Sequence, residues 1–156
     1  MVSFRIIAVA CALLGAPVLL HAQREKLPPD DLDLVEKQWP NALKSNTGIR
    51  YVIETPGTGP LIDSGEIVSV NYEGRFLNGK IFDRNHNRIK PFTFRVNRGV
   101  VIPGWDQILQ LMSLGAKWIV IVPPELGYGR MGSPPRIPSY ATLVFEIEIL
   151  AVKRDE

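Results

Sequence analysis

The side chains that most covalent enzyme mechanisms need are scarce in this chain. Its 156 residues include two histidines and one cysteine. His21 and Cys11 belong to the N-terminal stretch, and His86 lies in a polar segment where we expect it to be solvated. Glu146 and Glu148 alternate with apolar residues, which predicts the polar face of a strand rather than a catalytic pair of carboxylates. We find no nucleophile-elbow, phosphate-loop or zinc-helix motif, so we expect no metal site and no cofactor.

A second group of residues could act by binding rather than by breaking bonds. Aromatic and aliphatic side chains gather beside the expected loops, at Tyr72, Phe82, Phe92, Val101, Ile102, Trp105, Tyr128, Ile137 and Phe145. By composition alone such residues most often form only a core. Asp83 directly follows an apolar strand end, and Tyr128 stands between two glycines. These two polar residues favour an apolar pocket with polar groups at its edge.

The segment 101–105 is where an extended apolar stretch meets a short helix. Pro103 suits the first turn of a helix, where a missing N–H costs little. Gly104 permits close approach of another backbone. We expect a helix over residues 103–112, with a sheet wrapped around it. The floor of the pocket would then be formed by Val101, Ile102 and Trp105.

The remaining globular part has the pattern of short strands. Short runs bounded by turn residues predict strands over residues 49–53, 67–77, 81–83, 92–96, 117–122 and 142–149, and apolar residues alternate with polar ones in most of the second, fourth and last of them. The Asn78-Gly79 pair predicts a hairpin between the second and third of these. The sequence therefore indicates an α+β domain, with a five- to six-stranded, mostly antiparallel sheet curled around one short α-helix.

The first 22 residues have the pattern of a secretory signal. Arg5 precedes an apolar run over residues 6–20, and Leu20-His21-Ala22 fits a cleavage site. The alternative, a membrane anchor, needs about 20 apolar residues, and this run is shorter and interrupted by Gly15 and Pro17. We expect cleavage after Ala22 and contact with a membrane only through this segment.

Residues 23–45 are expected to form a linker with a short helix. Asp30 and Asp31 are N-cap candidates for a helix over residues 32–39, which Pro40 would end. This helix would pack Trp39 on the domain or remain loose, and a partner-docking arm is a further alternative. Residues 46–154 would form the folded domain.

Charge and cysteine content limit the compartment and partners. The chain carries 18 Lys and Arg against 16 Asp and Glu, without a basic stripe, so we expect no nucleic-acid partner. The mature domain would lack cysteine and therefore disulfides. With no Asn-x-Ser/Thr site and no ER-retention ending, the bacterial periplasm fits better than the ER lumen or secretion.

Eight motifs, in order, resemble the FKBP-type peptidyl-prolyl cis–trans isomerases over residues 46–154. They are Val-x-Val-x-Tyr-x-Gly (68–74), Asn-Gly-x-x-Phe-Asp (78–83), Pro-Phe-x-Phe (91–94), Val-Ile-Pro-Gly-Trp-Asp (101–106), Met-x-x-Gly (112–115), Tyr-Gly-x-x-Gly (128–132), Ile-Pro (137–138) and Ala-Thr-Leu-Val-Phe-Glu-Ile-Glu-Ile-Leu (141–150). Each motif alone is weak. Their order and spacing together make the resemblance specific.

The resemblance implies a proline-binding pocket between the sheet and the short helix. Trp105 would form the floor, with Ile137 and Arg136 among the substrate-binding residues. The catalytic residues would be Asp83 at the polar edge and two donors, the Ile102 N–H and the Tyr128 hydroxyl. The walls would consist of Tyr72, Phe82, Phe92, Val101, Ile102 and Phe145.

The same resemblance implies a monomeric isomerase that assists the folding of exported proteins. Its substrates would be unfolded or extended proline-containing polypeptides, and rapamycin and tacrolimus would inhibit it. Rotation about an X–Pro amide needs no nucleophile, so the scarcity of histidine and cysteine is no obstacle. A binding module or chaperone that uses the same pocket without catalysis is the alternative.

Four positions depart from the family pattern. Asn71 and Ser133 stand where histidine is frequent, and Ile108 occupies a position that is commonly glycine. Arg136 stands where an aliphatic residue is common, in a loop that would overhang the pocket. We expect this arginine to alter substrate preference and to favour an acidic residue before proline.

Overall fold

The computed structural model describes residues 24–154. The expected signal segment, its cleavage site and Cys11 lie outside these residues. Among the described residues, no helix is long and apolar enough to cross a membrane.

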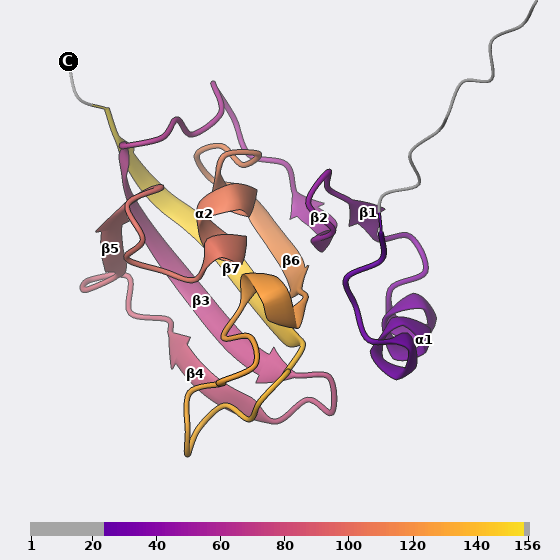
Figure 1. Ribbon diagram of the computed structural model, residues 1–156. Coiled ribbons are helices and arrows are strands. Elements are labelled where there is room, and N and C mark those ends of the chain that lie inside the picture. The colour runs from indigo at the N-terminus through magenta and orange to yellow at the C-terminus, as the bar shows by residue number, and fades with distance from the viewer. Residues whose placement is uncertain (1–23, 155–156) are drawn as a thin grey trace, which may run out of the picture.

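Seven antiparallel strands form one sheet in the order β1-β2-β6-β7-β3-β4, and β5 pairs with β3 beyond this path. Figure 1 shows β3 and β7 side by side as the long central strands. The strands are β1 (Leu43–Lys44), β2 (Arg50–Thr55), β3 (Ile67–Phe76), β4 (Ile81–Asn85), β5 (Phe92–Arg95), β6 (Lys117–Val122) and β7 (Leu143–Lys153).

The central strand β3 has the alternation that its sequence predicts. Val68 and Val70 are fully buried, and Tyr72 is half-buried on the same side of the strand. The chain then turns at Asn78-Gly79 into β4, and the Phe76 N–H donates to the Lys80 carbonyl across this turn. The expected hairpin is therefore present.

One face of the sheet packs against α2 (Pro103–Leu109). Figure 1 shows this short helix lying across β3 and β7. Trp105, Ile108 and Leu109 point into the main core with the buried residues of β3, β6 and β7. The helix ends three residues earlier than expected. Met112 is nevertheless fully buried, in the turn that follows the helix.

The opposite face carries a second, smaller core beneath α1 (Pro29–Gln38). Val35 of this helix is fully buried, and Leu27 just before it is 4% exposed. They pack against Ile121 of β6 and Val144 of β7. The apolar residues on both sides of β6 are thereby buried by two different helices.

The N-terminal segment differs from the expected linker. The helix begins at Pro29 after Pro28 as the N-cap residue, so Asp30 and Asp31 lie in its first turn instead of capping it. Proline at the first helical position is favoured because its missing N–H would have no partner there. Residues 43–44 pair with β2, so the segment 23–45 contributes to the sheet from residue 43 onward.

The α+β architecture with an antiparallel sheet around a short helix is confirmed. The strand number is seven rather than five or six, because the short strand β1 adds to one edge. The described residues also contain a second α-helix, α1, and a short 3-10 helix, η1 (Pro124–Leu126). The latter begins the long loop that leads to β7.

Candidate functional site

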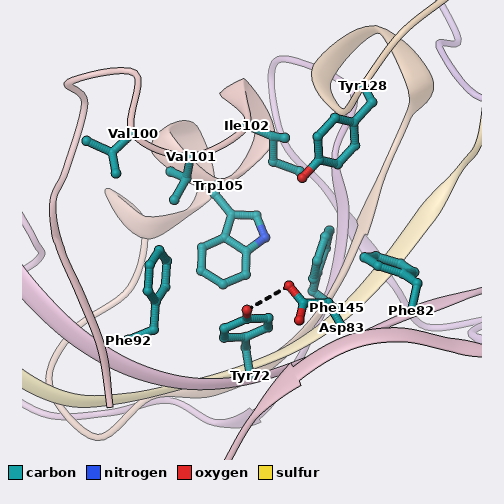
Figure 2. Close-up of a pocket in the computed structure, with 10 residues that line it drawn as sticks. All are labelled: Tyr72, Phe82, Asp83, Phe92, Val100, Val101, Ile102, Trp105, Tyr128 and Phe145. Atoms are coloured by element: carbon teal, nitrogen blue, oxygen red, sulfur yellow. Dashed lines mark hydrogen bonds between the residues drawn. The ribbon is translucent and has the colours of Figure 1, made fainter. Parts of the chain in front are cut away.

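A cavity of about 150 Å³ opens where α2 faces the sheet. Figure 2 shows its side chains converging from α2, from the sheet and from two loops. Its lining residues are Tyr72, Phe82, Asp83, Phe92, Val100, Val101, Ile102, Trp105, Tyr128 and Phe145. Every expected site residue except Arg136 and Ile137 lies here, and Val100 was not expected.

Trp105 lies at the base of this pocket and is 3% exposed. Its ring meets the edges of Tyr72 and Phe145, with ring centres 5.1 and 5.3 Å apart. Gly104 lets the helix that bears Trp105 approach β6 closely, because a Cβ there would lie 2.6 Å from Val122 Cγ1. The glycine therefore sets how deep the tryptophan lies.

The aromatic walls depend on a second glycine, in β3. A Cβ at Gly74 would lie 2.7 Å from the Phe82 ring and 2.8 Å from the Phe145 ring. Without that atom the two rings pack edge to face, with centres 5.7 Å apart. Phe92 of β5 lies on the opposite side of Trp105 (Figure 2) and contacts Tyr72. The pocket thus has rigid apolar walls on a sheet scaffold.

A short hydrogen bond marks the polar edge of the pocket. The Tyr72 hydroxyl donates to Asp83 Oδ2 at 2.8 Å, and the Arg84 N–H donates to Asp83 Oδ1 at 2.9 Å. Burial, followed by this contact with Asp83, raises the pKa of the Tyr72 hydroxyl well above its ordinary value. Tyr72 therefore remains a neutral donor, and it holds the Asp83 side chain in place.

The Ile102 N–H and the Tyr128 hydroxyl at the pocket have no partner within residues 24–154, and neither does the buried indole N–H of Trp105. The Ile102 carbonyl accepts hydrogen bonds from the N–H groups of Trp105 and Asp106, but no oxygen accepts from the Ile102 N–H. Tyr128 is 40% exposed, and Figure 2 shows its hydroxyl pointing into the pocket near Ile102. A carbonyl-bearing ligand would find both donors available.

Asp106 fixes the loop that carries Val100 and Val101, a feature the sequence reasoning missed. This side chain is 7% exposed. Its Oδ1 accepts from the Asn97 N–H at 2.7 Å and its Oδ2 from the Gly99 N–H at 3.2 Å. The only sequence signal was an acidic residue directly after Trp105. Asp106 thus ties the pocket rim to the same helix that supplies the floor.

Arg136 and Ile137 line a second cavity, of about 270 Å³, which shares Phe82, Asp83 and Tyr128 with the first. Ile137 is 3% exposed, whereas Arg136 is exposed. These two residues are therefore neighbours of the first pocket rather than part of its wall. In the part of the chain that the structure describes, no group of three or more His, Cys, Asp or Glu is placed to hold a metal ion.

Known proteins with similar sequences belong to one family. A family model described as FKBP-type peptidyl-prolyl cis-trans isomerase matches residues 59–150. The chain is similar to FK506-binding protein 1A of Aspergillus fumigatus, with 39% identity over 106 residues, which make up 67% of this chain and 95% of that protein. It is also similar to the FKBP-type peptidyl-prolyl cis-trans isomerase FkpA of Escherichia coli K12, with 41% identity over 109 residues. That match covers 70% of this chain and 39% of the bacterial protein, so the chain spans well under half of this relative's length.

Two solved structures show the same fold at substantial identity. The crystal structure of a peptidyl-prolyl cis-trans isomerase from Pseudomonas syringae matches with a TM-score of 0.70 and 37% identity, covering 80% of this chain and 92% of that chain. The crystal structure of FkpA from Escherichia coli matches with a TM-score of 0.71 and 37% identity, covering 80% of this chain and 58% of that chain.

Proposed function

Because this chain belongs to the FKBP-type peptidyl-prolyl cis-trans isomerase family, we propose that its aromatic pocket binds a prolyl residue and accelerates rotation about the preceding amide. The family resemblance and the isomerase class expected from the motifs are confirmed by these matches. The observation that carries the proposal is the pocket itself: a tryptophan floor, aromatic walls and two donors without partners.

The proposed mechanism is non-covalent and needs no cofactor. Rotation of an amide crosses a barrier of about 18–20 kcal/mol because resonance is lost when the group twists. A planar amide is more polar than a twisted one, so transfer into an apolar pocket destabilises the planar form more. The walls around Trp105 supply that environment. No bond is made or broken, so no residue has to transfer a proton.

The two free donors would orient the peptide. We assign the Ile102 N–H to a carbonyl of the bound chain, because this amide lies at the N-cap of α2 and has no acceptor within residues 24–154. The Tyr128 hydroxyl would bind a second carbonyl. Oriented hydrogen bonds that form best in the twisted geometry lower the barrier.

Asp83 would act on the electrostatics of the site. Both of its oxygens already accept hydrogen bonds, from Tyr72 and from the Arg84 N–H. Its fixed negative charge lies at the edge of the pocket. In one orientation of the planar amide this charge would disfavour the carbonyl dipole, and it would favour the rotated amide. In this role Asp83 neither gives nor takes a proton.

The compartment, clients and inhibitors belong to the same proposal. Residues 1–22 have the pattern of a secretory signal, which supports export and a periplasmic location. The substrates would be extended proline-containing segments of exported proteins, and the protein would act as a monomer. Rapamycin and tacrolimus would compete for the pocket; the name of the fungal relative records FK506 binding by that protein.

A protease-free NMR exchange measurement on a proline peptide tests the proposal. We expect catalytic amounts of the protein to raise the cis–trans exchange rate, and rapamycin to abolish the increase. Saturable binding of the peptide without faster exchange would instead support the binding module or chaperone. If the peptide neither binds nor exchanges faster, both the isomerase and the binding-module interpretations of the pocket are refuted.

A further inference from the structure

Three cavities follow one another from the pocket toward the N-terminal helix. The first and second share Phe82, Asp83 and Tyr128. The second and a third, of about 700 Å³, share Pro134, Pro135, Arg136 and Ile137. The third cavity also includes Asp31 and Leu34 of α1 and residues of the β3–β4 hairpin. We call the second and third cavities together the side groove.

We propose that the side groove binds an acidic, partly apolar segment of the same client chain whose proline occupies the pocket. This inference rests on the proposed function, because the pocket sets where the client chain enters the groove. The occupant is one extended polypeptide because the pocket and the groove share lining residues. A chain that contacts Tyr128 and Phe82 in the pocket already contacts the first part of the groove. The pocket alone has room for little more than a prolyl residue.

The apolar part of the groove consists of side chains that the fold leaves uncovered. Leu34 of α1 is 46% exposed, and Tyr140, in the loop before β7, is 60% exposed. Phe76 and Leu77, in the hairpin, are half-buried. Lone exposed apolar residues are common, but several that line one cavity indicate a binding surface. A client segment with apolar side chains would cover them.

The wall formed by α1 is fixed in place before any client arrives. Val35, on the other side of the helix, is fully buried against the sheet. The Thr142 hydroxyl donates to Asp31 Oδ2 at 2.6 Å, and Gln38 Nε2 donates to the Leu77 carbonyl at 3.4 Å. These contacts tie α1 to the loop and to the hairpin that form the rest of the groove. Binding therefore requires no ordering of this wall.

The charges of the groove favour an acidic occupant. Lys80 and Arg136 line it, and neither side chain has an ion pair or hydrogen bond within residues 24–154. Two carboxylates also line the groove, Asp31 in the third cavity and Asp83 in the second, and each already accepts hydrogen bonds from this chain. The formal charges of the groove therefore balance, but only its two cations lack a partner, so carboxylates of a client can form ion pairs that the fold leaves unmade.

Peptides of two lengths separate the groove from the pocket. The short one is a tetrapeptide, Ala-Leu-Pro-Phe, which reaches only the pocket. The long ones add about six residues rich in Glu and Leu, roughly 20 Å when extended, on either the amino or the carboxyl side. We expect at least one long peptide to have a kcat/KM about tenfold above the tetrapeptide, through a lower KM, and the advantage to shrink as salt screens the charges.

Groove variants then assign the effect to named residues. Lys80→Glu should reduce the long-to-short ratio of kcat/KM by about threefold, and Leu34→Gln by a similar factor through lost apolar contact. Lys37→Glu, elsewhere on α1, and Leu43→Gln, on β1, are matched controls because neither residue lines the three cavities. Both controls should retain the wild-type ratio.

The possible outcomes distinguish failure of the proposed function from failure of the side groove. If the tetrapeptide is not isomerised faster at all, the proposed function fails and the groove with it. If it is isomerised but neither long peptide gains, or if the controls lower the ratio as much as the groove variants do, the side groove is refuted and the proposed function stands. A gain that a basic extension reproduces would refute the acidic character of the occupant.

Discussion

Tyr72 and Asp83 are the polar pair at the edge of the pocket, and the proposed mechanism uses them without any proton transfer. The tyrosine hydroxyl donates to the Asp83 carboxylate, and its pKa is raised by burial and by that acceptor. Ionisation of Tyr72 is therefore moved further from neutrality than in free tyrosine. The pair acts as a fixed structural and electrostatic unit at the edge of an apolar cavity.

Replacing Tyr72 by phenylalanine removes this unit and keeps the ring. We expect Tyr72→Phe to lower kcat/KM for a proline tetrapeptide by about tenfold and the free energy of unfolding by about 1 kcal/mol. The ring can still pack on Trp105, so the pocket keeps its shape. Steady-state NMR exchange and urea denaturation measure the two effects. Unchanged kcat/KM alongside the lower stability would show that the pair has only a structural role.

Asp106 acts through the loop it holds rather than through contact with a ligand. We expect Asp106→Ala to raise KM severalfold with a smaller change in kcat, because Val100 and Val101 lose their fixed position. Two backbone N–H groups would also lose a buried acceptor, which costs about 2 kcal/mol of stability. Amide hydrogen exchange at Asn97 and Gly99 should accelerate.

Asp106→Asn provides the control for this positioning role. It keeps one acceptor oxygen and nearly the same shape, so KM should lie between the wild-type and alanine values. A KM that is unchanged in Asp106→Ala, despite faster exchange of the loop, would mean that the loop position does not matter for substrate binding.

At the scale of elements, α1 makes the sheet a middle layer between two helices. Val35 of this helix and Leu27 just before it are buried on the face opposite to α2, against Ile121 and Val144. Its attachment is therefore hydrophobic and independent of the pocket. The same helix presents Leu34 toward the side groove, so one element stabilises the domain and extends its surface.

Val35→Ala measures the attachment of α1 directly. Removing two buried methyl groups should lower the free energy of unfolding by about 2 kcal/mol. Leu34→Ala on the same helix should change it by no more than about 0.5 kcal/mol, because Leu34 is half exposed. Urea denaturation of both variants gives the comparison. Equal effects of the two substitutions would contradict the packing of this helix on the sheet.

Glu25 ties the segment before α1 to the sheet by charge. Its Oε2 contacts Lys44 Nζ at 2.8 Å and Arg50 Nη2 at 3.0 Å. Partial burial raises the pKa of this carboxyl, but hydrogen bonds from Lys44, the Leu27 N–H and Arg50 outweigh burial and lower the pKa from 4.5 to about 2. The charged form is therefore the form that stabilises the fold.

The pH dependence follows from the sign of this shift. Stabilisation by Glu25 is fully present above pH 4.5 and is lost as the pH falls toward about 2. We expect the free energy of unfolding to fall more steeply over this interval in the wild type than in Glu25→Gln. Denaturation at several pH values checks this, and identical slopes would show that the ion pairs of Glu25 contribute nothing to stability.

At the scale of the whole molecule, local signals were enough for most of the sheet. The alternation in β3 and the Asn78-Gly79 turn follow from backbone preferences that act over a few residues. Pro103 likewise marks the start of α2. The pocket residues could be predicted because the motifs that resemble the family contain them, and these motifs lie in the same strands, turn and helix start.

The remaining features depend on contacts between distant parts of the chain. Trp118, Val120 and Val122 lie on one face of β6, and Ile119 and Ile121 lie on the other. Nothing local in the sequence says that residues 29–38 cover this second face. Val100, at the pocket rim, is 59% exposed and resembles any loop valine in sequence. The strand β1 has only two residues, too few for a periodic pattern.

The central claim is that a prolyl peptide occupies the Trp105 pocket with a carbonyl on the Ile102 N–H. The most direct measurement is the amide proton shift of Ile102 in a ¹⁵N-labelled sample titrated with Ala-Leu-Pro-Phe. We predict a saturable downfield shift, together with a shift of the Trp105 indole N–H, and no such change with Ala-Leu-Ala-Phe. An Ile102 amide that does not move at saturation, while catalysis proceeds, would contradict the account.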